Sequence, residues 1–202
     1  TAPGKLVAGL VARRDAGAGP ITLISCDNVP DNGAMLERVL RDMVSRAVPD
    51  LEQCLDDEVG FVTTMVDRIT PRATDAIWQA VQDEQGVDDP AAIGTEPFSE
   101  WVLAGDLKGQ VPDWASVGAV FVDDVVPHEL RKLWLLNGAH SLLAYAATIK
   151  GHQTVSDAMA DPIVRGWVDE WWDVAARQLP LDDAVIADYR AALLERFGNP
   201  RM

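Results

Sequence analysis

The chain has 202 residues, of which 48% are hydrophobic and 24% are charged. This length and composition are typical of a globular protein with one sizeable core or two small ones, and they exclude a disordered chain. The formal net charge of −15 disfavours nucleic acid and anionic membranes as partners, because both would repel an acidic surface.

The sequence indicates a cytoplasmic protein. No apolar run approaches the roughly 20 residues of a membrane span, and the first residues lack the basic-then-apolar order of a secretory signal. With only two cysteines, Cys26 and Cys54, and no paired CxxC motif, we expect reduced thiols.

Hydrophobic spacing predicts an α/β part at the N-terminus. The end of a helix and a Gly-rich turn precede a short β-branched strand at residues 21–28, and a helix follows over residues 34–48, where Pro49 ends it. Residues 59–71 have strand character, and residues 74–85 have the pattern of an amphipathic helix. Two short mixed segments follow at residues 96–107 and 114–124, and we expect the second to be extended.

The second half of the chain is predicted to be helical. Pro127 suits the first position of a helix, and the pattern then runs to about Ile149. Two further helices are predicted over residues 162–179 and 181–198, with Gly198 as the stop signal. The predicted fold class is mostly α with a small α/β N-terminal part, and we place the domain boundary so that residues 1–70 and 71–202 form separate domains.

Three polar residues interrupt the apolar helix predicted after Pro127. At 100° per residue, Asn137 lies about 140° and His140 about 80° around the helix from Lys132, so all three share one arc. The rest of the circumference is expected to contact a core and consists of Leu133, Trp134, Leu135, Leu136, Leu142 and Leu143.

This polar stripe has a catalytic and a structural interpretation. A lysine that loses hydration becomes easier to deprotonate, and a neutral amine near pH 7 is the base that oxidation of an alcohol requires. Asn137 and His140 can donate hydrogen bonds to an oxygen that gains negative charge. In the structural interpretation, Lys132 extends to solvent, Asn137 bonds to backbone and His140 is a satisfied core histidine.

Five ordered motifs give the chain a resemblance to a known family. They are "CDN" (26–28), "MVDRITP" (65–71), "EPFSEWV" (96–102), "FVDDVVPHELRKLWLLNGAHSLLAY" (121–145) and "DAMADP" (157–162). Together they resemble the polyol-specific long-chain dehydrogenase/reductase family, which includes mannitol 2-dehydrogenases, fructuronate and tagaturonate reductases and arabinitol dehydrogenases. The resemblance implies that the helical part, residues 71–202, is the substrate domain, truncated at its C-terminus, and that residues 1–70 are the end of a Rossmann-type cofactor domain.

The resemblance also implies roles for individual residues. Lys132 corresponds to the general acid/base, Asn137 and Asn28 to the oxyanion hole, and His140 to a substrate ligand. Glu129 resembles the family's proton relay, with an ordinary surface glutamate as the alternative.

Two neighbouring charged residues resemble residues that line the family's substrate pocket. These are Asp67 and Arg68, for which a structural ion pair is the alternative. No metal is expected, because the lysine supplies the base and nothing pairs with His128 or His152 at metal-ligand spacing. Residues 61–64 read "FVTT" where many family members have Phe-Pro-Asn-Ser or Phe-Pro-Cys-Thr, so the sequence does not identify the polyol.

The cofactor of the family is NAD or NADP, but the chain lacks the motif that binds its diphosphate. The only GxG, Gly17-Ala18-Gly19, precedes a strand instead of joining a strand to a helix. We therefore expect the nicotinamide cofactor to bind mainly to a domain absent from this chain, and the cofactor-binding residues remain unassigned.

The implied function is interconversion of a sugar alcohol and its ketose, of the mannitol/fructose type, with a small-molecule polyol or ketose as the partner. Fructuronate or tagaturonate reduction is one alternative. A catalytically silent helical interaction module is another. The sequence does not distinguish NAD from NADP as the cofactor, and it does not indicate the oligomeric state.

Overall fold

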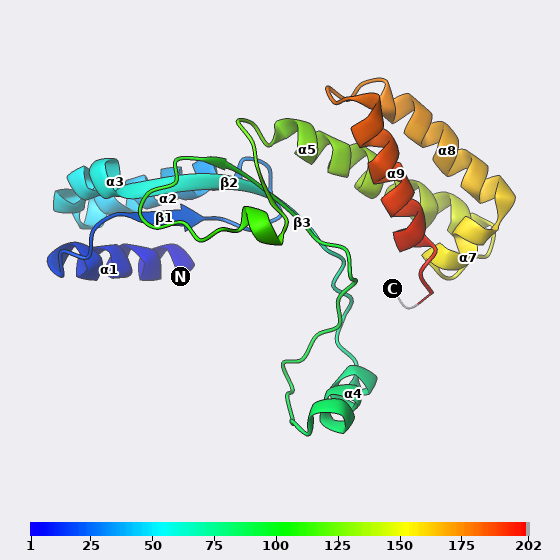
Figure 1. The fold of residues 1–202 in the computed structure, drawn as a ribbon, viewed down its shortest axis with the longest axis horizontal. Helices are drawn as coiled ribbons and strands as arrows, with labels where there is room; N and C mark the ends of the chain where they lie inside the picture. Colours follow the sequence, from blue (N-terminus) through cyan, green and yellow to red (C-terminus); the bar gives the residue numbers. More distant parts are fainter. Residues whose placement is uncertain (201–202) are drawn as a thin grey trace. The chain divides into compact units, whose positions relative to one another are not determined.

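A computed structural model of the chain describes residues 1–200, which divide into two units. The first unit contains residues 1–66 and 100–126, and the second contains residues 67–99 and the chain from Pro127 onward (Figure 1). We expected residues 71–202 to form one helical domain. Residues 100–126 instead return to the first unit, because they supply two of its strands.

The first unit is built on a four-stranded sheet. Its strands are β1 (Ile21–Ile24), β2 (Val59–Asp67), β3 (Glu100–Gly105) and β4 (Ala119–Phe121), in the order β1-β2-β3-β4. β1 runs parallel to β2, with Ile21 opposite Val59, and β3 runs parallel to β4, with Trp101 opposite Ala119. The predicted strands at residues 21–28 and 59–71 are thus confirmed, although β1 ends at Ile24.

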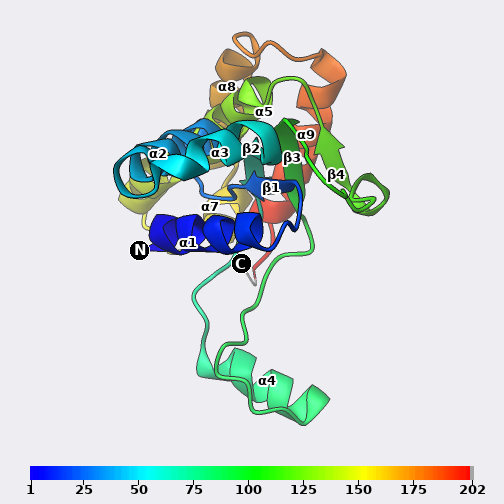
Figure 2. The same ribbon diagram turned by 90° about the vertical axis from the view of Figure 1, so that its left-hand side faces the viewer.

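Three helices pack beside β1 and β2. They are α1 (Ala2–Asp15), α2 (Asn32–Ala47) and α3 (Glu52–Glu58), which follows the 3₁₀ turn η1 (Pro49–Leu51). They group at one side of the unit, whereas β4 lies at the opposite edge of the sheet (Figures 1 and 2). Their shared core consists of Val7, Leu10, Leu40, Val44, Leu51, Leu55 and Val59.

The helix at residues 34–48 is confirmed as α2, but α3 was not predicted. Pro49 ends α2 as expected and also starts the next helical turn, since a proline is tolerated at a helix N-terminus. Leu51 and Leu55, four residues apart, are both buried, and this contact with the core is what holds the short helix in place.

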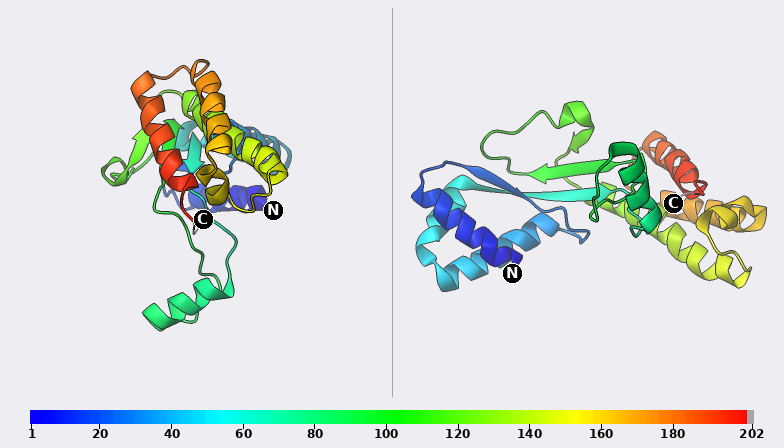
Figure 3. Two further views of the ribbon diagram at one scale, coloured as in Figure 1. Left: turned by 90° about the vertical axis from the view of Figure 1, so that its right-hand side faces the viewer. Right: turned by 90° about the horizontal axis from the view of Figure 1, so that it is seen from below.

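The second unit is helical. It contains α4 (Asp75–Gln85), α7 (Val155–Ala160), α8 (Pro162–Ala176), α9 (Asp183–Phe197) and one long helical run from Val126 to Ile149. α8 packs against α7, α9 and the long run (Figure 3). α4 stands apart from α8 and α9, and none of its residues is buried (Figure 1). The helices expected at residues 74–85, 162–179 and 181–198 are confirmed, and α7 was not predicted.

The long run is helical to Ile149, as predicted, but it is not a uniform α-helix. It consists of α5 (Val126–Arg131), the π-helical turn η3 (Lys132–Asn137), α6 (Gly138–Leu142), a second π-helical turn η4 (Leu143–Ala147) and a last short stretch of α-helix. Its buried side packs on α8 and α9, and the core includes Leu135, Leu136, Ala139, Leu143, Val164, Val168, Trp172, Leu193 and Phe197. Across residues 1–200, no helix is both long enough and apolar enough to cross a membrane.

Candidate active site

The predicted catalytic residues of the second unit lie on the long helical run. Lys132, Asn137 and His140 are all half-buried. Leu135, Leu136 and Leu143 are buried, as expected, and Trp134 and Leu142 are partly buried against the same core. Leu133 was predicted to contact the core but is 51% exposed, which corrects that assignment.

The helical run widens at the π-helical turn η3. The N–H of Gly138 bonds to the carbonyl of Leu133, five residues earlier. An i→i+5 turn is wider than an α-helical turn, so residues five apart lie on nearly the same side. Lys132 and Asn137 are five residues apart, and the angle of 140° derived for an α-helix is therefore too large. The turn places these two side chains closer to a common face than the sequence pattern predicts.

His140 is held next to the C-terminal end of α9. Its ring lies 4.7 Å from the ring of Phe197, centroid to centroid. Burial, and then the positive charge of Arg196, lower the pKa of His140 below its ordinary value, whereas the carboxylates of Asp67 and Glu96 act in the opposite direction. His140 is therefore a neutral imidazole at pH 7, able to donate one hydrogen bond and accept another.

The three charged groups that act on this histidine form a buried ionic network. The guanidinium of Arg196 donates to both carboxylate oxygens of Asp67, at 2.8 and 2.9 Å, and to both oxygens of Glu96, at 2.9 and 2.8 Å. The hydroxyl of Tyr189 donates to Asp67 at 3.0 Å. Arg196 also lies 4.2 Å above the ring of Phe98. The hydrogen bonds and charges of the two carboxylates outweigh the cost of burial and hold the pKa of Arg196 above its usual range.

This network determines where Asp67 and Arg68 point. Asp67 is 4% exposed and pairs with Arg196, not with its neighbour Arg68. Arg68 is exposed, and its Nε donates to the backbone carbonyl of Glu96 at 3.1 Å. Contact of either side chain with a substrate stays a prediction.

Sequence reasoning missed Glu96, Tyr189 and Arg196. A signal for Arg196 was present, because it continues the spacing of the apolar residues on α9 and so lies on the buried face of that helix. A charged side chain on a buried face needs a partner. Its partners lie 100 and 129 residues earlier in the chain, and no local pattern connects them.

The other predicted residues take the following positions. Glu129 is half-buried on α5, one turn before Lys132. Asn28 is exposed in the loop between β1 and α2 of the first unit, and its convergence with Lys132 on one cavity stays a prediction. Within the described part of the chain, no three His, Cys, Asp or Glu side chains gather where they could hold a metal ion.

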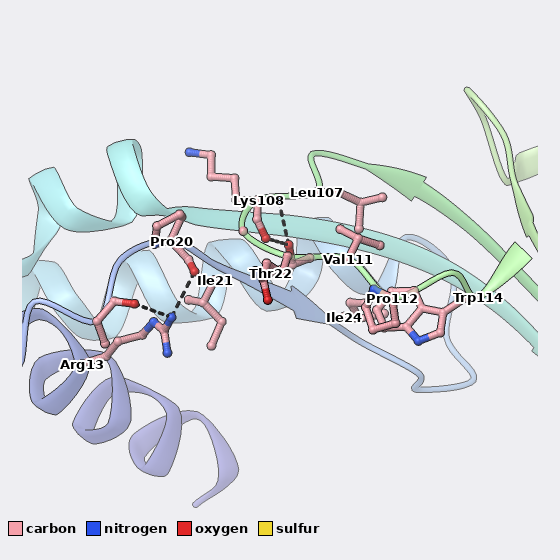
Figure 4. Close-up of a pocket in the computed structure, with 13 residues that line it drawn as sticks. Arg13, Pro20, Ile21, Thr22, Ile24, Leu107, Lys108, Val111, Pro112 and Trp114 are labelled. Atoms are coloured by element: carbon pink, nitrogen blue, oxygen red, sulfur yellow. Dashed lines mark hydrogen bonds between the residues drawn. The ribbon is translucent and has the colours of Figure 1, made fainter.

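The first unit has a groove of about 570 Å³. It follows β1, and its walls include Arg13, Thr22, Lys108 and Trp114 (Figure 4). Internal hydrogen bonds already engage its polar groups: Arg13 donates to backbone carbonyls of residues 18–20, and Thr22 bonds to the backbone of Lys108. None of Asn28, Lys132, Asn137 and His140 lines it.

Family comparisons cover nearly the whole chain. Residues 1–116 match the model of the mannitol dehydrogenase Rossmann domain, and residues 124–202 match that of the mannitol dehydrogenase C-terminal domain. The chain belongs to the mannitol dehydrogenase family. The boundary between the two mannitol dehydrogenase matches falls after residue 116, later than the expected residue 70, since β3 and most of the segment leading to β4 belong to the first match.

Individual members of the mannitol dehydrogenase family are similar over the full chain. D-mannonate oxidoreductase of Escherichia coli is 38% identical over 204 residues, covering 100% of this chain and 42% of the relative. D-arabinitol 4-dehydrogenase of Ralstonia nicotianae is 39% identical over 199 residues, covering 98% of this chain and 43% of the relative. The structure of Pseudomonas fluorescens mannitol 2-dehydrogenase with NAD and D-mannitol is 36% identical, with a TM-score of 0.81, and covers 98% of this chain and 41% of that one. The chain thus spans about two fifths of these mannitol dehydrogenase relatives.

Proposed function

We propose that this chain carries the substrate-binding and catalytic portion of a nicotinamide-dependent polyol dehydrogenase that interconverts a sugar alcohol and its ketose. The observation that carries the proposal is the polar stripe of the second unit. Lys132, Asn137 and His140 are half-buried on one helix, and the π-helical turn brings Lys132 and Asn137 toward a common face. Membership of the mannitol dehydrogenase family supports the same assignment.

In the proposed mechanism, Lys132 moves the proton. During oxidation its neutral amine accepts the proton of the reacting hydroxyl, and during reduction its ammonium returns a proton to the same oxygen. The amide groups of Asn137 and Asn28 donate hydrogen bonds to this oxygen while it carries partial negative charge. Glu129, one turn before Lys132, passes the proton between the lysine and solvent.

The remaining residues bind and orient the substrate. Neutral His140 can exchange hydrogen bonds with a hydroxyl next to the reacting carbon. Asp67 acts by orienting its polar neighbours, since its carboxylate already pairs with Arg196 and Tyr189. Arg68 keeps an exposed guanidinium that suits the hydroxyls or the carboxylate of a sugar-derived substrate.

The described residues hold no glycine-rich turn that leads from a strand directly into a helix, the arrangement that typically binds the diphosphate of a nicotinamide cofactor. Gly17 and Gly19 precede β1, and α2, which follows β1, begins at Asn32-Gly33. A side chain at Gly33 would meet the backbone nitrogen of Thr63 at 2.5 Å, so this helix N-terminus packs closely against β2. NAD or NADP, which exchanges hydride with the reacting carbon, is therefore expected to bind mainly through residues outside this chain.

The relatives' names also support an alternative substrate class. D-mannonate oxidoreductase, at 38% identity, is named for a sugar acid, so reduction of fructuronate or tagaturonate is the second candidate function. A catalytically silent interaction module is the third. We place the protein in the cytoplasm, with a small-molecule substrate as its partner, and assign no oligomeric state.

A substrate panel tests the proposal. The full-length protein that contains this chain is assayed with mannitol, arabinitol and mannonate as alcohols and with fructose, fructuronate and tagaturonate as carbonyl substrates, each with NAD(H) and NADP(H). The proposal expects turnover of a sugar alcohol and its ketose. Turnover confined to the uronates favours the second candidate. A folded protein that turns over none of the six contradicts the proposal and favours the silent module.

A further inference from the structure

The loop that carries Asn28 is fixed to strand β2 by a buried amide. Asn32, at the start of α2, is 2% exposed. Its Nδ2 donates to the backbone carbonyl of Asp27 at 2.8 Å and to that of Thr64 at 2.8 Å, and its Oδ1 accepts from the N–H of Thr64 at 2.9 Å. The side chain therefore joins the residue directly before Asn28 to the middle of β2.

A second buried side chain holds the same loop two residues earlier. The hydroxyl of Thr64, also 2% exposed, donates to the backbone carbonyl of Ser25 at 2.6 Å. The carbonyl of Asp27 additionally accepts the N–H of Val29 at 2.9 Å, which closes a tight turn around Asn28. The backbone is thus tied down at residues 25 and 27, and the exposed Asn28 follows at once.

The backbone at the N-terminus of α2 lies directly against β2, where Asn32 bonds to Thr64. Gly33 lies so close to β2 that a Cβ atom would sit 2.5 Å from the nitrogen and 2.6 Å from the hydroxyl oxygen of Thr63. Asp31, directly before the helix, has φ +54°, the only positive φ of a non-glycine residue in the described part of the chain. Such a conformation costs on the order of 1 kcal/mol and persists where surrounding contacts determine it.

A group that stabilises a transition state must be placed to within about 0.5 Å, and a displacement of about 1 Å costs on the order of 100-fold in rate. Asn28 sits in an exposed loop, and the buried bonds of Asn32 and Thr64 fix the backbone directly before it. We propose that Asn32 and Thr64 are positioning residues that hold Asn28 where its amide donates to the reacting oxygen. This inference rests on the proposed function.

Two variants test the inference in the full-length protein, and a third is the control. Thr64→Val is close in shape and removes both the bond to Ser25 and the 3.5 Å contact of the hydroxyl with Nδ2 of Asn32, and Asn32→Ala removes every printed contact of the amide. Thr22→Val is the matched control, because the hydroxyl of Thr22 in β1 bonds to the backbone of Lys108 at 2.8 and 2.7 Å, away from the Asn28 loop. The measurements are kcat, KM, the cofactor Kd and the melting temperature.

The inference predicts a specific loss of turnover. In Thr64→Val, kcat should fall on the order of 10-fold, while the cofactor Kd stays within about twofold of the wild-type value. Thr22→Val should lower the melting temperature by a similar amount and leave kcat unchanged. If both threonine variants lower kcat in proportion to their loss of stability, Thr64 has only a structural role and the inference is overturned.

A double-mutant cycle with Asn28→Ala shows whether the effect passes through Asn28. If it does, Thr64→Val and Asn32→Ala change kcat less than twofold in the Asn28→Ala background, because there is no amide left to position. Additive losses overturn the inference while leaving the oxyanion role of Asn28 intact. An Asn28→Ala variant with full turnover instead contradicts the proposed function itself.

Discussion

Replacement of Arg196 by leucine should destabilise the second unit by several kcal/mol. The substitution removes the cation that pairs with the carboxylates of Asp67 and Glu96, whose side chains are 3% and 2% exposed. Removing one partner of a buried ion pair costs about 3–5 kcal/mol, because an uncompensated charge stays behind. This is a large fraction of the roughly 5–15 kcal/mol that stabilises a typical domain.

The loss should also depend on pH, which separates it from a packing effect. Without the guanidinium, the folded variant holds two buried carboxylates with no opposite charge, and protonation removes that uncompensated charge. The folded variant then binds protons more readily than its unfolded chain. Its free energy of unfolding therefore increases as the pH falls from neutral into the acidic range, and the penalty is greatest at neutral pH.

Urea unfolding at pH 7 and pH 5, followed by tryptophan fluorescence, measures both effects. Arg165→Leu is the control, since Arg165 pairs with Asp169 at 3.1 Å on the surface of α8 with both side chains more than one third exposed. It should cost less than about 1 kcal/mol. If Arg196→Leu costs no more than the control, or loses as much stability at pH 5 as at pH 7, the network is not a buried ion pair of the kind described.

Two further predictions concern one glycine and one histidine. Gly33→Ala should destabilise the first unit by about 1–3 kcal/mol, because its Cβ would meet β2. The control Gly9→Ala, in open space on α1, should stabilise the unit by about 0.5–1 kcal/mol. A urea midpoint of Gly33→Ala above that of Gly9→Ala would contradict the close approach of α2 to β2. His140, titrated by NMR, should show a pKa below about 6.5, and its contribution to stability should be present above that pH and lost as the pH falls through the lowered pKa. A pKa above the ordinary value would mean that the carboxylates outweigh burial and Arg196.

Periodicity and end signals were enough to locate most of the helices. The apolar spacing of α2 and α8 marked the faces that are buried, and Pro162 and Gly198 lie at helix ends as expected. The short helices α3 and α7 escaped prediction because six or seven residues carry too few turns for a period to be recognised.

The sequence pattern does not predict which residues far apart in the chain contact one another. Nothing local indicates that residues 100–126 return to the sheet of the first unit, or that Arg196 binds carboxylates at positions 67 and 96. The polar stripe of Lys132, Asn137 and His140 could be found, since polar residues in an apolar helix stand out. The π-helical turn could not, because its wider hydrogen bonding has no distinct residue pattern.

The turnover of a Lys132→Ala variant of the full-length protein tests directly whether Lys132 is the general acid/base. We expect kcat at pH 7 to fall by on the order of 100-fold or more. The Kd for the nicotinamide cofactor should stay near the wild-type value, because the lysine acts on the alcohol and not on the nucleotide. Near-normal turnover of the alanine variant at pH 7, with the cofactor still bound, would contradict that role.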